Sequence, residues 1–390
     1  MFTSRPANSR PVGLERNERD FARYINPHER ETIVKMNRFG RVATIASAAA
    51  ISALLLSACS GGGGSNLSGD LAGAGSSAQG SAQESWIAAF QTANENVNIT
   101  YDPAGSGAGR QQFIAGGVAF AGSDSYLSDD ELKKTFAACA PSTLPFEVPA
   151  YISPIAVIYN VAGVKDLNLD ATVLAKIFAG QITKWNDPAI VALNSGATLP
   201  DLAISPVHRS DDSGTTKNFT DYLHKVAPAA WTKDAAGLFP FKTGEGAQGT
   251  SGVVSAVKNG KGTIGYADFS KAAGLGVANI KVGDKFVAPS AAGAAAVVQD
   301  STVVSGRDKA DLAFKIARTT TNPSHYPLVL VSYIIGCQQY ADAKIAPLVK
   351  AYVGYVVSPE GQAVAAKAAG SAPLTADLSA KAAAIVAAVK

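Results

Sequence analysis

The sequence predicts an α/β protein with two lobes. Short β-branched runs alternate with helical stretches, glycine-rich turns separate them, and 390 residues are enough for more than one domain. Hydrophobic residues make up 47% of the chain and charged residues 17%, which excludes a disordered charged polymer. Glycine is frequent, but it shows no G-X-Y period, so the chain is not collagen-like.

Positive charge is concentrated at the front of the chain. Of the 34 basic and 31 acidic residues, nine and five lie in 1–58, which leaves 25 and 26 for the rest. A near-neutral body without a basic stripe argues against nucleic acid as a partner.

The first 58 residues are predicted to be an N-terminal extension followed by a lipoprotein signal peptide. Met36 opens a segment with two basic residues, Arg38 and Arg41, and an apolar run over 42–56. This run has the length of a signal-peptide core and is short for a membrane span. The true start is either the first residue or Met36, and the sequence leaves the choice open.

The next residues predict a lipid anchor. The run Leu56-Ser57-Ala58-Cys59 matches the lipobox of bacterial lipoproteins, in which the chain is cut before the cysteine and the sulfur is acylated. Residues 59–68 are rich in glycine and serine and are predicted to be a flexible tether. An ordinary signal peptide with an incidental cysteine is the alternative. We expect lipidation, with palmitate as the acyl group, and a position on the outer, extracytoplasmic face of the cell membrane.

Two cysteines remain in the body, Cys139 and Cys337. An even pair in an exported protein is most simply a disulfide, here closing a long loop and stabilising the fold by roughly 2–4 kcal/mol. Two buried free thiols are the alternative. The sequence has no C-x-x-C, so neither a zinc ribbon nor a thioredoxin-type site is supported.

Strands and helices can be placed along the body in order. Strands are expected where apolar or β-branched residues lie between turn residues, at 99–101, 148–160, 203–208 and 264–266. Pro154 is expected to interrupt the second of these.

Helix starts are predicted from capping patterns. Ser81–Glu84 and Ser128–Glu131 have the capping-box spacing. A further helix is expected over 251–259, ended by Gly260, and the alanine-rich tail over 358–390 is expected to be helical.

Four loops of small residues lie between these elements. They are Gly73–Ala78, Gly105–Arg110, Gly122–Ser125 and His208–Thr216. Glycines let the backbone approach an anion, and a helix start offers free N–H groups at the positive end of its dipole. The first loop also fits a relaxed G-x-G-x-x-A dinucleotide pattern, but an exported lipoprotein has no nicotinamide supply. A tight strand-to-helix turn is the alternative for it.

The fourth loop is the most informative. Arg209 supplies a planar guanidinium group that can donate hydrogen bonds to two oxygens of an oxyanion. Ser213, Gly214 and Thr215 supply backbone N–H groups at a helix start, together with two hydroxyls. The alternative is a capped surface helix with Asp211 or Ser213 as its N-cap.

These loops resemble a known family, the phosphate-binding protein of the bacterial high-affinity phosphate ABC transporter. Arg209 to Thr215 is close to that family's R-x-D-x-S-G-T signature. Residues 178–188 resemble its hallmark segment in the second lobe. Further segments that resemble it, within a similarity spanning 70–374, are Phe120–Asp124, Leu127–Asp129, Gly262–Tyr266 and Ser358–Gln362.

The resemblance implies a periplasmic-binding-protein type II fold, with two α/β lobes, a two-stranded hinge and the ligand in the cleft between them. The first lobe would comprise 69–149 and 268–390, and the second 150–267. The hinge crossovers would lie near 148–152 and 266–270.

The resemblance also implies one phosphate buried in the cleft. The family's contacts would fall on Ser77, Ala78, Ser106, Asp124, Arg209, Asp211, Ser213, Gly214 and Thr215. Asp124 would accept the proton that phosphate still carries near neutral pH, which disfavours sulfate. Ser77 and Ala78 are smaller than the threonine and aromatic residue often found in the family, and Asp212 is expected to point to solvent.

The function implied is extracytoplasmic binding of inorganic phosphate and its delivery to the permease subunits of an ABC transporter. We expect a monomer that needs no cofactor, metal or nucleic acid. A receptor for another oxyanion such as sulfate, and a surface adhesin or signalling lipoprotein, are the alternatives. An exported phosphatase is disfavoured because His208, His224 and His325 lack metal-binding spacing and no nucleophile motif occurs, so no catalytic residue is assigned.

Overall fold

The computed structural model describes residues 67–390. The predicted extension and signal peptide, the lipidation site Cys59 and the tether up to residue 66 lie outside the described residues. In the part of the chain that is described, no helix has both the length and the apolarity needed to cross a membrane.

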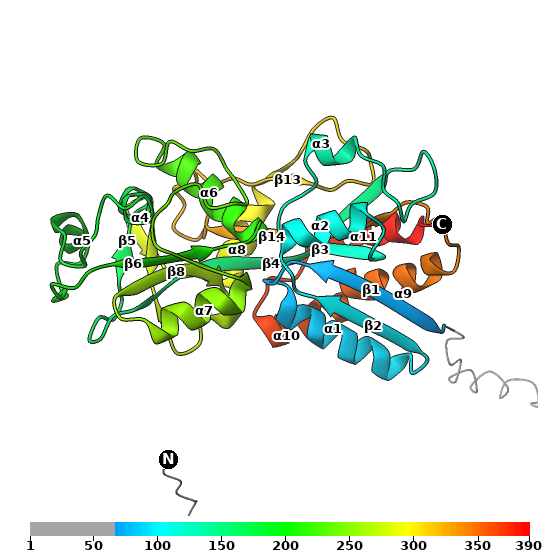
Figure 1. The fold of residues 1–390 in the computed structure, drawn as a ribbon, viewed down its shortest axis with the longest axis horizontal. Helices are drawn as coiled ribbons and strands as arrows, with labels where there is room; N and C mark the ends of the chain where they lie inside the picture. The colour runs from blue at the N-terminus through cyan, green and yellow to red at the C-terminus, as the bar shows by residue number, and fades with distance from the viewer. Residues whose placement is uncertain (1–66) are drawn as a thin grey trace, which may run out of the picture. The chain divides into compact units, whose positions relative to one another are not determined.

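A nine-stranded sheet runs through the described residues and supplies both lobes (Figure 1). The strand order is β2-β1-β3-β14-β4-β8-β6-β7, and β9 pairs with β4 beside this path. We call the part that contains β1, β2, β3 and β14 the first lobe, and the part that contains β6, β7 and β8 the second lobe. The bounds are Gly69–Gly75 (β1), Val97–Asp102 (β2), Phe120–Ser123 (β3), Pro145–Asn160 (β4), Ser205–Arg209 (β6), Glu245–Ala247 (β7), Thr263–Asp268 (β8), Gly276–Val277 (β9) and Val329–Cys337 (β14).

Two smaller sheets complete the strand pairing of the described residues. One has the order β11-β10-β5, and the other pairs β12 with β13. Their bounds are Asn168–Leu169 (β5), Asn279–Val282 (β10), Lys285–Val287 (β11), Thr302–Val303 (β12) and Phe314–Lys315 (β13).

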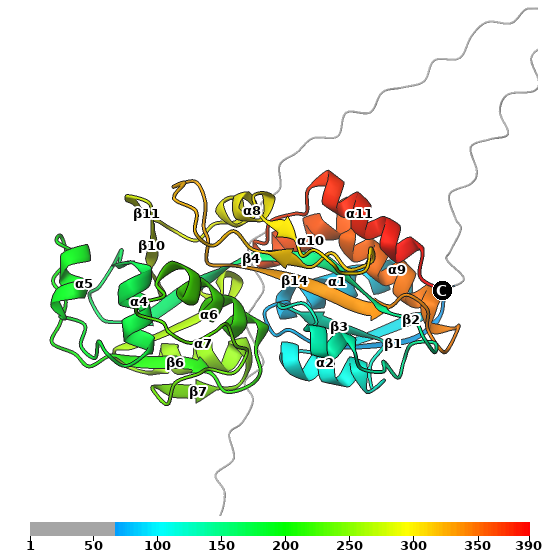
Figure 2. The same ribbon diagram turned by 90° about the horizontal axis from the view of Figure 1, so that it is seen from above.

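Helices pack around both lobes. In Figures 1 and 2, α4 to α7 lie with the second lobe, whereas α1, α2 and α9 to α11 lie with the first. The bounds are Gly80–Ala93 (α1), Ser106–Ile114 (α2), Asp129–Leu132 (α3), Ala171–Phe178 (α4), Pro188–Leu193 (α5), Gly214–Val226 (α6), Gly249–Asn259 (α7), Ala291–Gln299 (α8), Ile345–Val357 (α9), Pro359–Ala369 (α10) and Ala376–Ala387 (α11), with a 3₁₀ turn at Phe269–Lys271.

Strand β4 joins the two lobes. Its residues 145–154 pair antiparallel with β14, and its residues 155–160 pair with β8. The expected interruption at Pro154 is therefore wrong: the strand continues, and the proline marks the point where its partner changes. Proline has no N–H to contribute to a ladder, so it is tolerated where one pairing ends and the next begins.

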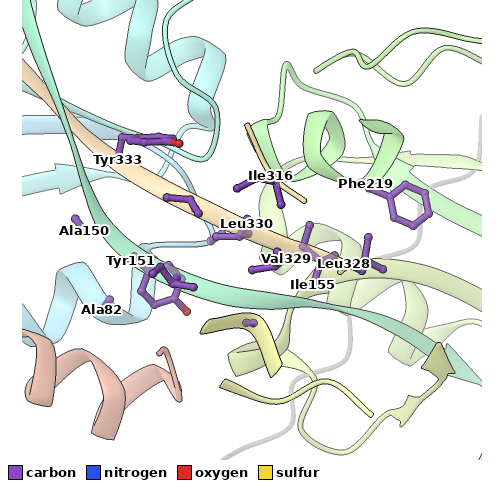
Figure 3. Close-up of a cluster of buried hydrophobic side chains, with 14 of the residues drawn as sticks. Ala82, Ala150, Tyr151, Ile155, Phe219, Ile316, Leu328, Val329, Leu330 and Tyr333 are labelled. Atoms are coloured by element: carbon purple, nitrogen blue, oxygen red, sulfur yellow. The ribbon is translucent and has the colours of Figure 1, made fainter. Parts of the chain in front are cut away.

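The middle of β4 is buried on both faces, which explains its nearly continuous apolar sequence. Figure 3 shows Tyr151 and Ile155 on β4 close to Val329 and Leu330 on β14. All four side chains are less than 1% exposed. The connection between the lobes is thus made by two packed strands rather than by a loose linker.

The strand pairing also bears on where the predicted lobes divide. β9 pairs with residues 158–159 of β4, and β10 pairs with β5. Residues 276–282 therefore lie beside strands of the second lobe, although the sequence prediction assigned them to the first. The division at 149/150 and 267/268 remains a prediction.

Helix α1 begins differently from the prediction. The capping box at Ser128–Glu131 is present, but the one predicted at Ser81–Glu84 is not, because α1 begins at Gly80. The hydroxyl of Ser76 instead accepts the backbone N–H groups of Ala78 (3.1 Å) and Gln79 (3.3 Å). The hydroxyl of Ser76 thus holds the turn that leads into α1, whose N-cap Gln79 makes no side-chain capping bond.

Cys139 and Cys337 form a disulfide in the structure, as predicted. Their Cα atoms are 5.3 Å apart, although the residues are 198 positions apart in the sequence. The bond fixes the end of β14, and the loop that it closes contains the whole second lobe.

Candidate functional site

The four small-residue loops meet where the two lobes touch. Each follows the carboxyl end of a strand, namely β1, β2, β3 and β6, and three of them lead into α1, α2 and α6. The N–H of Gly105 donates to the carbonyl of Gly75 (2.8 Å), and the N–H of Gly107 donates to the carbonyl of Asp212 (2.9 Å). Several helix N-termini therefore converge on one place, as in anion sites of α/β proteins.

Asp124 lies at the centre of this arrangement and is 3% exposed. Its Oδ1 accepts hydrogen bonds from the hydroxyls of Ser76 and Ser332, the second at 2.6 Å. Its Oδ2 accepts from the hydroxyl of Thr215 at 2.8 Å. Thr215 belongs to the second lobe, so the carboxylate is shared between hydroxyls of both lobes.

Ser106 and Gly214 bring α2 and α6 against Asp124. The hydroxyl of Ser106 accepts the backbone N–H of Asp124 at 3.1 Å. A Cβ on Gly214 would lie 2.7 Å from Ser106 Oγ and 2.8 Å from Asp124 Cβ. Only glycine allows the N-terminus of α6 to come this close.

Ser213 is the N-cap of α6, as one of the predicted alternatives had it. Its hydroxyl accepts the N–H of Thr216 at 3.1 Å, which leaves its own proton available for another acceptor. Capping and ligand binding are therefore compatible at this position.

Arg209 is paired with Asp211 beside this centre. Arg209 is 3% exposed; its Nε donates to Asp211 Oδ1 at 2.7 Å, and its Nη2 donates to Oδ2. Burial alone would raise the pKa of Asp211, but the hydrogen bonds and charge of Arg209, with the N–H of Gly249, hold it below its ordinary value. The carboxylate thereby fixes the guanidinium plane.

The two lobes are in direct contact at the site. Besides the bond between Thr215 and Asp124, Asn218 Nδ2 donates to the Asp124 carbonyl at 2.6 Å. A cavity of about 140 Å³ lies beside Asp124 and is lined in part by Lys217 and Arg318. Burial lowers the pKa of Lys217, which lies over the ring of Tyr126. The site is thus closed, and cationic side chains line the space next to it.

Comparisons with known proteins identify the family. Residues 60–360 match the PBP superfamily domain. The chain is 36% identical over 342 residues to "Phosphate-binding protein PstS3" of Mycobacterium bovis (strain BCG / Pasteur 1173P2), covering 82% of this chain and 90% of that protein. It is 34% identical over 370 residues to "Phosphate-binding protein PstS 2" of Mycobacterium tuberculosis (strain ATCC 25618 / H37Rv), covering 90% and 100%. The chain belongs to the PBP superfamily and, within it, to the PstS family.

Solved structures support the fold of this PstS family member. A phosphate-bound, high-affinity periplasmic phosphate-binding protein (PfluDING) is similar with a TM-score of 0.66 and 23% identity, over 81% of this chain and 93% of its own. The phosphate-binding protein from Stenotrophomonas maltophilia is similar with a TM-score of 0.61 and 20% identity, over 81% and 93%. The periplasmic-binding-protein fold expected from the sequence is therefore confirmed.

The first small-residue loop of this PstS family member, Gly73–Ala78, differs in detail from the prediction. The hydroxyl beside Asp124 belongs to Ser76, which the prediction left out. The hydroxyl of Ser77 faces the start of α7, 2.9 Å from Thr250 Oγ1, and accepts the Thr250 N–H at 3.0 Å. The backbone N–H of Ala78 donates to Ser76. Two adjacent serines fit the loop equally well, and the sequence does not indicate which one turns inward.

Asp212 is partly exposed to solvent, as expected, but it also contacts the first lobe. Its side chain is 39% exposed, and its Oδ2 lies 3.5 Å from Arg110 Nη2 in the first lobe. A Cβ on Gly107 would lie 2.4 Å from this oxygen, so a neighbouring glycine makes room for the carboxylate. The charge is balanced across the lobe contact rather than by water alone.

Arg110 is the second residue that the sequence prediction missed. It is 6% exposed, and its Nε donates to Glu131 Oε1 at 2.8 Å. Its Nη1 donates to the hydroxyls of Ser123 (3.1 Å) and Ser125 (3.0 Å), on either side of Asp124. The signal available in the sequence was an arginine directly after a glycine-rich helix start.

Metal binding and histidine chemistry receive no support at this site. Within residues 67–390, no group of three or more His, Cys, Asp or Glu side chains is placed to hold a metal ion. His208 Nδ1 lies 2.9 Å from the Arg209 carbonyl, and its ring stacks on Phe239 at a centroid distance of 4.0 Å. This histidine packs at the end of β6.

Proposed function

We propose that this PstS family member binds one inorganic phosphate between its lobes and delivers it to the permease of a phosphate ABC transporter. One observation carries the proposal: a buried carboxylate, Asp124, accepts hydroxyl hydrogen bonds from both lobes next to the start of α6 and the Arg209–Asp211 pair. The names of the mycobacterial relatives as phosphate-binding proteins support the choice of ligand.

The chemistry of the site suits a protonated tetrahedral oxyanion. Arg209, the hydroxyls and the free N–H groups at the start of α6 would bind the ligand's negative oxygens. Asp124 would accept the proton of hydrogen phosphate. Sulfate has no proton near neutral pH, so it would face the carboxylate without a hydrogen bond. A site that forms a hydrogen bond to one proton or hydroxyl of its ligand can bind it about 10⁴-fold more tightly than an analogue without that group, because the analogue leaves buried groups unpaired.

We further propose that the chain acts outside the cytoplasm as a monomer anchored by a lipid on Cys59. The lipobox and the glycine-rich tether support this anchor. The tether would let the lobes reach the permease while the acyl chain stays in the membrane.

Equilibrium dialysis of the purified protein against radiolabelled phosphate, after exhaustive removal of phosphate, tests the proposal. We expect one phosphate bound per chain and full displacement by unlabelled phosphate. Absence of saturable binding would refute the phosphate-binding function. Binding of more than one phosphate per chain would contradict a single enclosed site.

A further inference from the structure

A chain of buried hydrogen bonds leads from Asp124 into the core of the first lobe. Gln79 Nε2 lies 2.6 Å from Ser332 Oγ, and Ser332 Oγ lies 2.6 Å from Asp124 Oδ1. Behind Gln79, Gln83 Nε2 lies 2.8 Å from Gln79 Oε1, and Tyr352 Oη lies 2.6 Å from Gln83 Oε1. The four side chains behind Asp124 are at most 1% exposed.

The partners fix the direction of every bond in this chain. Gln79 Nε2 also lies 3.0 Å from the carbonyl of Tyr333, which can only accept, so this atom is the amide nitrogen. Gln79 thus donates to Ser332, and the Ser332 hydroxyl directs its own proton to Asp124. At the far end, burial raises the pKa of Tyr352 well above its usual value, so the phenol keeps its proton and donates to Gln83. All donors therefore point toward Asp124.

The direction of the hydrogen bond from the other hydroxyl on Oδ1, that of Ser76, is fixed in the same way. Ser76 Oγ accepts two backbone N–H groups at the start of α1, so its proton is directed to Asp124 as well. A carboxylate oxygen has two lone pairs. Ser76 and Ser332 occupy both of those on Oδ1, whereas Thr215 occupies only one on Oδ2. The remaining acceptor position is therefore on Oδ2, the oxygen that faces the second lobe.

We propose that Ser332 and Gln79 are positioning residues that set ligand selectivity: they hold Oδ1 of Asp124 as a saturated acceptor, so that Oδ2 presents its last lone pair to the proton of the bound anion. The inference rests on the proposed phosphate-binding function and deepens it. Without Ser332, Oδ1 is no longer saturated, so the carboxyl group is free to rotate. Oδ2 then no longer presents its lone pair at one fixed place, and the preference for an anion that carries a proton falls.

If these buried hydrogen bonds only supported the fold, a different result would be expected. The hydrogen bonds also tie α1 to β14 and α9, so removing one lowers the stability of the first lobe. Lower stability alone weakens the binding of phosphate and sulfate together and leaves their ratio unchanged. The ratio of the two affinities therefore separates positioning from support of the fold.

The test measures phosphate and sulfate affinities of the purified full chain and of Ser332→Ala, Ser332→Thr and Gln79→Met. We expect Ser332→Ala to lower the phosphate-to-sulfate ratio by about tenfold or more, as for loss of a hydrogen bond to a charged group. Ser332→Thr keeps the hydroxyl and should restore most of the ratio. Gln79→Met should lower it by a smaller factor, because Ser332 can then turn away. Ser379→Ala is the matched control, since this buried hydroxyl donates to the Val357 carbonyl away from the site.

A double variant shows whether Ser332 acts through Asp124. In Asp124→Asn the acceptor is already lost, so adding Ser332→Ala should leave the ratio within about twofold of the single variant. An unchanged ratio in Ser332→Ala, or independent effects in the double variant, would overturn this inference while the wild-type protein still binds phosphate. A wild-type protein that binds neither anion would overturn the proposed function and this inference with it.

Discussion

Asp124 shows what can be read from the sequence at the scale of single residues. Its position after a short apolar strand, and the Arg209–Asp211 pair, follow from the order of residue types in the loops. The direction in which each small side chain points cannot be predicted in this way, because Ser76 and Ser77 are the same residue type and differ only in how the backbone orients them. Ser332 is far from the loops in sequence, and only the pairing of β14 with β3 and β4 brings it to the site.

Replacing Asp124 by Asn should weaken phosphate binding and reduce the preference for phosphate over sulfate. The amide keeps the size of the side chain but presents a donor where the ligand's proton needs an acceptor. We expect a loss of phosphate affinity of about tenfold or more. Displacement of radiolabelled phosphate measures both quantities, and Asp201→Asn at an exposed surface ion pair serves as the control. If the phosphate affinity and the preference for phosphate over sulfate both stayed at wild-type values, Asp124 would not be the acceptor of the ligand's proton.

At the scale of elements, the strands and helix boundaries that were placed correctly are those that depend on local sequence. β2, β6 and β8 lie within two residues of their predicted positions, and α7 ends before Gly260 as expected. The course of β4 through Pro154 was not predictable, because it depends on β14 and β8 pairing with successive halves of one strand. The start of α1 was missed because the helix begins at Gly80, after a turn in which Ser76 accepts the N–H groups of Ala78 and Gln79, and no capping box forms at Ser81–Glu84.

Asp268 lies at the end of β8, where this strand pairs with β4 at the connection between the lobes. It is fully buried, pairs in register with Ile155 of β4, and accepts a hydrogen bond from the hydroxyl of Tyr151 at 3.0 Å. Burial raises its pKa to about 6, although hydrogen bonds from Ser270, Ser153 and Tyr151 oppose the shift. The folded protein therefore binds a proton more tightly than the unfolded chain, and this contribution to stability is lost as the pH rises from about 4 to about 6.

Asp268→Asn should remove this dependence, because the amide stays neutral. Relative to the wild type, the variant should gain on the order of 2 kcal/mol in unfolding free energy between pH 4 and pH 7. Urea unfolding at both pH values measures the difference, and Asp201→Asn at the surface should show no such change. A difference between variant and wild type that is the same at both pH values would mean that the carboxyl group is not protonated in the folded protein.

At the scale of the whole molecule, the predicted export signal made the disulfide predictable. Two body cysteines in a chain expected to be exported are most simply paired, and the structure confirms this pairing. The lobe division remains a prediction. The strands that bear on it, β9 and β10, are only two and four residues long, and their partners are far away in sequence.

Replacing Cys139 and Cys337 by Ser should lower the unfolding free energy by about 2–4 kcal/mol, mainly because the unfolded chain regains the freedom of a long loop. Phosphate affinity should change little, since the bond joins the far end of β14 to a first-lobe loop rather than to Asp124. Chemical unfolding with and without reductant measures the first effect. An equal stability of the double variant and the oxidised wild type would contradict a stabilising role for the bond.

On the proposed function, the Asp124 carboxylate shared by the two lobes selects an anion that carries a proton. Isothermal titration calorimetry of the purified, phosphate-depleted protein with phosphate and then with sulfate measures this selectivity. We predict tight one-to-one binding of phosphate and no measurable heat with sulfate. Sulfate binding as tight as phosphate binding would contradict the role of Asp124 and move the assignment to another oxyanion.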